Sequence, residues 1–285
     1  MIILSYYLCI MSSAPRTIHI GRLSLEYFCF GSGETTVICL HGHGRPASDF
    51  EFVASEERRV ISLHLFHHGN SRFPENEIEE NPLKIEEFTE VFEQLLEVED
   101  VERFHLFAFS QGGRFSLCIL PFFAEKIETV TLISPDGMDN WSFYNWSSRQ
   151  KWARRVFQRL EKHPEKVAKY SSIANKMKLM RPKVRAFVDE FSSDEERFKR
   201  ASQTWRNFRM LRPDIAKIKK VLRDHPVTFL IIMGSYDQVI RPKQAYRFAR
   251  KIGQPDCVKE IPNGHHFFKP SSINKFLHLL PFGQQ

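Results

Sequence analysis

The run Ala-Phe-Ser-Gln-Gly at positions 108–112 constrains the fold of this 285-residue chain more than any other feature. The preceding segment 103–109 alternates and then becomes apolar, as a buried strand does, and the next eight residues have the apolar spacing of a helix. Ser110 is therefore expected at a sharp strand-to-helix turn. Residues two before and two after it must be small there, and Ala108 and Gly112 satisfy that requirement. This pattern is typical of a nucleophile elbow.

A second strand-to-loop junction lies upstream. The apolar run 36–40 leads directly into His-Gly-His-Gly-Arg at 41–45. A loop in this position turns its backbone N–H groups toward the elbow, so the backbone N–H groups of His43 and Gln111 are the predicted oxyanion hole. His41 has no metal-like spacing to a partner and is predicted to be a hydrogen-bonding loop residue.

Candidates for an acid and a base follow later strands. The apolar run 227–233 ends in Gly-Ser-Tyr-Asp, which makes Asp237 the candidate acid. Asp136, which also follows an apolar run, is its rival and is otherwise a turn residue. The turn after the last predicted strand presents His265 as the candidate base, with His266 as its competitor. An ordinary helix N-cap is the alternative role for Ser110.

This order of serine, acid and histidine, with the HGHG loop upstream, resembles the α/β-hydrolase superfamily over nearly the whole chain. Positions 46–50 resemble the start of the family's first helix, and 66–71 resemble its G-H-G-x-S turn. The chain departs from the family at Ala108, where glycine is usual, and at His64 and His67, where the family often has an aspartate and a glycine. The resemblance implies an α/β fold, with a mostly parallel central sheet, helices on both faces and an inserted helical cap.

The resemblance also implies a chemistry. Gly264-His265 is the family's usual dipeptide, which favours His265 and gives the triad Ser110, Asp237 and His265. His265 would take the serine proton as Oγ attacks an acyl carbon, Asp237 would fix the imidazole tautomer, and water would hydrolyse the acyl-enzyme. The predicted function is a serine hydrolase for an ester or thioester of an apolar acyl or aromatic small molecule. The alternatives are hydrolysis of an activated carbon–carbon bond and a catalytically silent protein of this fold that binds a ligand or a membrane surface.

No coenzyme or nucleotide motif accompanies these residues, so no cofactor is expected. His64, His67 and His68 form a cluster with no Cys or carboxylate at metal-ligand spacing. A solvated or supporting role for these histidines is favoured over a metal site.

Charge is segregated along the chain. Residues 148–225 carry 23 Lys and Arg against 9 Asp and Glu, a local net charge of +14, whereas the remainder has 18 against 25, a net charge of −7. This basic segment lies where the superfamily commonly inserts its cap, and its apolar residues recur with helical spacing. We therefore predict an α/β-hydrolase core at 16–139 and 226–285, a basic helical cap at 140–225, and a leader at 1–15.

The basic cap suggests a partner. Its positive field would steer an anionic membrane surface, a phosphate-bearing acyl carrier or an acidic substrate toward the site. Nucleic acid is not expected, because no binding motif for it accompanies the charge. Aromatic residues at the start of the cap predict an apolar substrate pocket: Trp141, Phe143, Tyr144 and Trp146. The alternatives are a solvated charged face and ordinary helix packing.

The cysteines and the N-terminus indicate a compartment. Five scattered cysteines, an odd number set mostly among apolar residues, are typical of buried thiols in a reducing compartment. The first ten residues are apolar but too short to span a bilayer, and no basic residue precedes them. We predict a cytoplasmic protein whose true start is Met11, with a weak membrane anchor as the alternative.

Overall fold

The computed structural model describes residues 14–139, 143–163 and 194–282, and the chain divides into two compact units. The first unit comprises Met1–Phe73, Lys84–Asn140 and Leu211–Gln285. The second comprises Pro74–Leu83 and Trp141–Met210. Most of the predicted leader, residues 1–13, lies outside the described residues.

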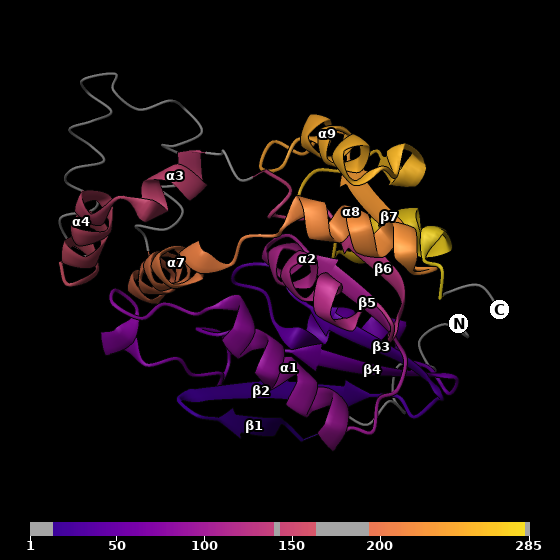
Figure 1. Cartoon of the computed structure of the whole chain (residues 1–285), viewed down its shortest axis with the longest axis horizontal. Coiled ribbons are helices and arrows are strands. Elements are labelled where there is room, and N and C mark those ends of the chain that lie inside the picture. Colours follow the sequence, from indigo (N-terminus) through magenta and orange to yellow (C-terminus); the bar gives the residue numbers. More distant parts are fainter. Residues whose placement is uncertain (1–13, 140–142, 164–193, 283–285) are drawn as a thin grey trace. The chain divides into compact units, whose positions relative to one another are not determined.

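A mostly parallel sheet forms the centre of the first unit (Figure 1). In the described part of the chain it has eight strands in the order β1-β2-β4-β3-β5-β6-β7-β8. The first two pairings, β1 with β2 and β2 with β4, are antiparallel, and all the others are parallel. The strands are β1 (Arg16–Ile20), β2 (Leu23–Phe30), β3 (Thr35–Leu40), β4 (Arg58–Leu63), β5 (Phe104–Phe109), β6 (Ile127–Ile133), β7 (Thr228–Gly234) and β8 (Val258–Ile261).

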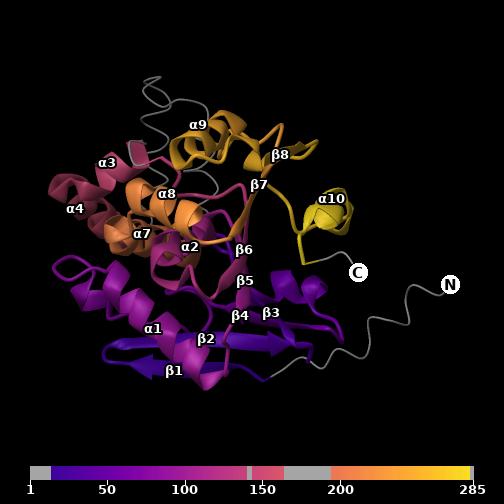
Figure 2. The ribbon, with the colours of Figure 1, turned by 45° about the vertical axis from the view of Figure 1, so that its right-hand side comes forward.

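Helices cover both faces of this sheet, which confirms the predicted fold class (Figure 2). The α-helices of the first unit are α1 (Ile85–Val98), α2 (Gln111–Phe123), α8 (Ile215–Asp224), α9 (Pro242–Ile252) and α10 (Pro270–Phe276). Helix α2 packs against β3, β5 and β6, with α1 and α8 as its neighbours. On the opposite face lie α10 and the 3-10 helix η2 (Ala47–Val53). The shorter 3-10 helices are η5 (Pro255–Cys257) and η6 (Leu277–Leu279).

Alternation along β5 explains how one strand serves two layers. Successive side chains of a strand point to opposite faces. Phe107 and Phe109 join an aromatic core with Phe50 of η2 and Phe276 of α10. The intervening Ala108 is fully buried and small. The end of β5 is thereby fixed between two packed layers, and the residue that follows it is Ser110.

The second unit is helical in its described part. Its elements are η3 (Glu75–Glu77), α3 (Phe143–Arg149), α4 (Lys151–Glu161), α7 (Glu195–Asn207) and η4 (Phe208–Met210). Phe157 of α4 packs on Trp205 of α7, with ring centroids 4.4 Å apart. Arg206 of α7 reaches two carboxylates, Glu79 at 2.9 Å and Glu161 of α4. Within the ranges that the structure describes, no helix combines the length and apolarity needed to cross a membrane.

The bounds of this unit differ from the predicted cap at 140–225. The segment Pro74–Leu83 belongs to it, because Glu79 accepts hydrogen bonds from Arg154 at 2.8 Å and from Arg206. The unit ends at Met210, and α8 belongs to the first unit, where it contacts α2 and α9. The lysines of α8 continue the basic composition along the chain, so charge alone did not mark the boundary.

Candidate active site

Ser110 occupies the turn between β5 and α2 with φ 48°, in the left-handed region that a non-glycine residue seldom adopts. Its N–H donates to the C=O of Ile133 at 3.0 Å. Its C=O accepts from the N–H groups of Gly113 at 2.9 Å and Asp136 at 2.7 Å. Strained residues of this kind persist where surrounding structure holds them, and they concentrate at functional sites.

Small residues around Ser110 are required by close contacts, as the sequence predicts for Gly112. A Cβ on Gly112 would lie 2.1 Å from the backbone oxygen of Leu40. The same holds at Gly113, where a Cβ would lie 2.4 Å from Pro135 Cβ. The requirement at Gly113 comes from the loop after β6, and the five-residue motif does not include it.

His265 bridges Ser110 and Asp237. Its Nδ1 lies 2.7 Å from Oδ2 of Asp237, and its Nε2 lies 3.1 Å from Oγ of Ser110. A carboxylate only accepts hydrogen bonds, so Nδ1 carries the proton and Nε2 accepts from the serine hydroxyl. The three side chains come from the ends of β5, β7 and β8, which meet at the carboxyl edge of the sheet.

Asp237 is buried, yet its environment favours the charged form. Its Oδ1 accepts the backbone N–H groups of Val239 at 2.8 Å and Ile240 at 2.9 Å. Burial by itself would raise the pKa of this carboxyl, but the hydrogen bond and charge of His265 and the Ile240 N–H outweigh it and hold the pKa below its ordinary value. The carboxylate is therefore ionised at neutral pH.

The two rival candidates are placed elsewhere. Asp136 forms a two-pronged ion pair with Arg114, at 2.8 and 2.9 Å, and its Oδ1 also accepts the N–H of Gly137. His266 is exposed, and it is His265 that contacts Ser110 and Asp237.

Two residues are predicted to form the oxyanion hole, Gln111 directly after Ser110 and His43 in a separate loop. Gln111 is the first residue of α2, and first-turn N–H groups have no acceptor within their own helix. His43 lies in the loop 41–45. A Cβ on Gly42 of that loop would stand 3.2 Å from Ser110 Cβ, so the loop backbone at Gly42 passes close to Ser110.

One member of the histidine cluster after β4 is held by a buried carboxylate. His64 stands where the family often has an aspartate, and its Nδ1 lies 2.6 Å from Glu26, a buried carboxylate on β2. Glu26 also accepts the backbone and side-chain N–H groups of Asn70, at 2.9 and 2.6 Å. A carboxylate from the neighbouring strand thus anchors this turn. No local sequence pattern indicates this role for Glu26, since it lies 38 residues from His64.

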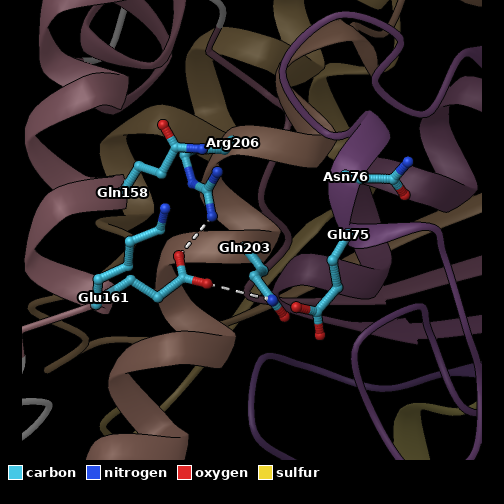
Figure 3. A pocket seen from close by; sticks show the side chains of 7 residues that line it. Glu75, Asn76, Gln158, Glu161, Gln203 and Arg206 are labelled. Atoms are coloured by element: carbon cyan, nitrogen blue, oxygen red, sulfur yellow. Dashed lines mark hydrogen bonds and ion pairs between the residues drawn. The ribbon is translucent and has the colours of Figure 1, made fainter.

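A small polar hollow of about 200 Å³ lies within the second unit (Figure 3). The lining residues are Glu75, Asn76, Gln158, Glu161, Lys162, Gln203 and Arg206. Glu161 is engaged there by Arg206 and Gln203. None of the three residues Ser110, Asp237 and His265 lines the hollow. Of the aromatic residues predicted to line a pocket, Trp141 and the side chains of Phe143 and Tyr144 lie outside the described residues, and Trp146 is about half exposed.

A mostly parallel sheet with a strained serine after β5 and a histidine and carboxylate on later loops defines the α/β-hydrolase fold. The chain belongs to the α/β-hydrolase fold family, whose model matches residues 35–271.

Solved structures share this fold at low sequence identity. A probable hydrolytic enzyme from Pseudomonas aeruginosa PAO1 superposes with a TM-score of 0.66 at 17% identity, covering 95% of this chain and 94% of that one. A thermophilic esterase from Thermogutta terrifontis gives a TM-score of 0.63 at 16% identity, covering 94% and 96%.

One curated relative matches part of the chain. The dihydrolipoyllysine-residue acetyltransferase component of the acetoin cleaving system of Pseudomonas putida is 30% identical over 129 residues, which are 44% of this chain. The match spans about a third of that protein's length, 34%.

Proposed function

We propose that this protein is a serine hydrolase that cleaves an ester or thioester of an apolar acyl or aromatic small molecule. The observation that carries the proposal is the position of His265, within hydrogen-bond distance of both Ser110 Oγ and Asp237. In this arrangement a weakly nucleophilic hydroxyl is activated by an adjacent base that a third group orients. A role for Ser110 as a simple helix N-cap would leave the His265 contact unexplained, and its side chain makes no capping hydrogen bond.

The residues would act in sequence. His265 Nε2 takes the hydroxyl proton as Ser110 Oγ attacks the acyl carbon, and then returns it to the leaving alcohol or thiol. Asp237 keeps the proton of the other ring nitrogen in place and stabilises the imidazolium. Water then repeats the cycle on the acyl-enzyme, with His265 again as base, and releases the acid.

The oxyanion would be bound by the backbone N–H groups of His43 and Gln111. Donors aimed at the developing charge are worth roughly 3 kcal/mol each in acyl transfer. The position of Gln111 at the start of α2 and the approach of the loop 41–45 to Ser110 at Gly42 support this role.

The acyl class of the substrate rests on the serine and on the relatives. An aspartate at this turn would suit epoxides or haloalkanes, whereas a serine suits acyl groups. The Thermogutta protein is an esterase and the Pseudomonas putida relative is named for acetyl transfer. Both descriptions concern acyl chemistry.

We also propose that the basic second unit attracts an anionic membrane surface. Helix α4 exposes Trp152 and Val156, with 61% and 45% of their surfaces accessible, beside the exposed cations Lys151, Arg155 and Arg159. Indole and aliphatic groups flanked by cations suit the boundary between acyl chains and anionic headgroups. An acyl carrier would need only the charge, so the exposed apolar residues favour the membrane.

A fluorophosphonate probe tests the catalytic proposal, because only an activated serine is labelled. We expect labelling of the natural chain and of Ser116→Ala, and none of Ser110→Ala. Ser116 is the matched control, since it is a buried serine of α2, six residues after Ser110, whose hydroxyl donates to the C=O of Gly112. In hydrolysis of p-nitrophenyl acyl esters, the natural chain and Ser116→Ala should be active and Ser110→Ala should be inactive. Full turnover by folded Ser110→Ala would refute the proposal.

A further inference from the structure

For the proposed reaction, the backbone of the loop 41–45 must be held in a fixed position. Its Gly42 packs against the nucleophile turn, and Gly44 adopts a left-handed conformation with φ 69°. An oxyanion donor acts only when it is held at about 3 Å from the developing charge. The His43 N–H, which lies between these glycines, can therefore stabilise the oxyanion only if the loop is rigid.

His68 supplies that support through one ring nitrogen. The side chain is buried, with 4% of its surface accessible. Its Nδ1 lies 3.1 Å from the C=O of Phe66, and its Nε2 lies 2.9 Å from the backbone N of Gly44. A carbonyl only accepts, so Nδ1 carries the proton, and the Nε2 lone pair accepts the Gly44 N–H. These two contacts require the neutral ring in a single tautomer.

His41 also links the loop 41–45 to the turn after β4 through both of its ring nitrogens. It is fully buried, its Nδ1 lies 2.7 Å from the C=O of Gly42, and its Nε2 accepts the N–H of Leu65 at 3.0 Å. Its ring lies edge-on to His68, with centroids 4.7 Å apart. His41 reaches from the oxyanion loop to the turn after β4, and His68 reaches from that turn back to the loop.

The turn that carries His68 is itself anchored to β2. Glu26 holds His64 and Asn70, and the hydroxyl of Ser71 accepts the backbone N–H of Glu26 at 2.8 Å. Ser71 Oγ also donates to the C=O of His64 at 2.6 Å. Burial by itself would raise the pKa of Glu26, but the hydrogen bonds of its carboxylate with Asn70 and His64 outweigh burial and hold the pKa below its ordinary value. His68 therefore stands on a fixed base.

We propose that His68 is a positioning residue for the oxyanion hole, acting through its Nε2 acceptor on the Gly44 N–H. The inference rests on the proposed function and deepens it. Both ring nitrogens of His41 and of His68 are engaged by backbone groups, so each ring is held in one orientation.

The test compares His68→Leu, which removes the acceptor, with His68→Gln, whose side-chain oxygen can replace it. We expect His68→Leu to lower kcat at least about tenfold, with little change in KM. Complete loss of an oxyanion donor lowers kcat by about 10²–10³-fold, and a displaced donor should cause part of that loss. The affinity of His68→Leu for an alkyl boronic acid, which forms a tetrahedral adduct on Ser110, should fall by the same factor as its kcat. His68→Gln should restore most of both losses.

Three results would overturn the inference. The first is a folded His68→Leu enzyme with natural kcat and boronate affinity. The second is a loss that appears in KM alone. The third is a His68→Gln enzyme as impaired as His68→Leu, or, where His68→Leu does not fold, a His68→Gln enzyme impaired about tenfold or more.

A separate measurement distinguishes this inference from the proposed function. In the natural chain, an N–H···N hydrogen bond gives a scalar coupling between the Gly44 amide nitrogen and His68 Nε2 in NMR spectra. Absence of hydrolysis and of probe labelling would refute the hydrolase, whereas absence of this coupling would refute the His68 contact on its own.

Discussion

Buried Arg114 and partly exposed Asp136 form a two-pronged ion pair beside the turn at Ser110, with N–O distances of 2.8 and 2.9 Å. Arg114 also donates to the C=O of Leu211 at 3.0 Å, and the backbone N–H of Asp136 donates to Ser110. The pair thus ties α2 to the loop after β6 and to the start of the segment that leads into α8. This relationship separates the two candidate acids, because the carboxylate of Asp136 is committed to Arg114.

The two aspartates should give opposite phenotypes. Asp237→Asn should lower kcat by about four orders of magnitude, because an amide holds the wrong tautomer of the histidine, with little loss of stability. Asp136→Asn should lower the free energy of unfolding by about 1–3 kcal/mol, since Arg114 loses its charged partner, with little change in kcat. Ester hydrolysis and urea unfolding measure the two effects. Equal losses of kcat at both positions would contradict this assignment.

The adjacent histidines give a similarly matched pair. His265→Ala should lower kcat by at least about 10³-fold, because the serine loses its base. His266→Ala changes an exposed side chain and should alter kcat by no more than about twofold. Steady-state kinetics with one p-nitrophenyl ester compares them. The reverse order of severity would make His266 the base.

The contacts of Glu99 should make the stability of the folded protein depend on pH. This buried carboxylate accepts from Tyr27 at 2.6 Å and from Arg16 at 2.7 Å. Burial raises its pKa, but these partners outweigh burial and leave the pKa below its ordinary value. A carboxyl whose pKa is lowered in the folded state stabilises that state above the unfolded pKa, about 4.3, and loses the contribution as the pH falls through the folded value.

Glu99→Gln should therefore destabilise the protein by about 1–3 kcal/mol at pH 7. The difference from the natural chain should shrink as the pH falls below about 4. Urea unfolding at several pH values measures it. Glu97→Gln, at an exposed position in the last turn of α1 two residues before Glu99, is the control and should show no such dependence. A difference that stays constant with pH would disprove the charged interaction.

The basic second unit predicts a dependence on salt. Binding to anionic vesicles should fall steeply as salt rises from low concentration to about 0.5 M, where the Debye length is only a few ångströms. Cosedimentation with vesicles of anionic and of neutral phospholipid measures this binding, and hydrolysis of a neutral short ester should barely respond to salt.

Charge reversal at Lys151, Arg155 and Arg159 of α4 should weaken the same binding at low salt. A fourfold reversal at Lys166, Lys169, Lys176 and Lys178 should have the same effect, although these four lysines lie outside the described residues. Salt-independent binding, or binding of a phosphate-bearing acyl carrier without any binding of vesicles, would refute the membrane proposal.

Local sequence patterns determined much of the fold and of the candidate site. The apolar runs predicted the strands that end at Leu40, Phe109 and Gly234 to within a residue, because burial between two layers demands continuous apolar side chains. The turn at Ser110 was equally local. Its neighbours must be small to clear the adjoining backbone, and that requirement is visible within five residues.

The tertiary structure decided which distant groups meet. Asp136 and Asp237 both follow buried strands, and only the placement of β8 beside β7 brings His265 to Asp237 and leaves Asp136 to Arg114. Glu26 on β2 holds His64, which lies 38 residues further along the chain. Glu79 of Pro74–Leu83 binds Arg154 and Arg206, which lie 75 and 127 residues further along. Charge pairs and hydrogen bonds of this kind depend on distances in space, which residue type and spacing along the chain do not encode.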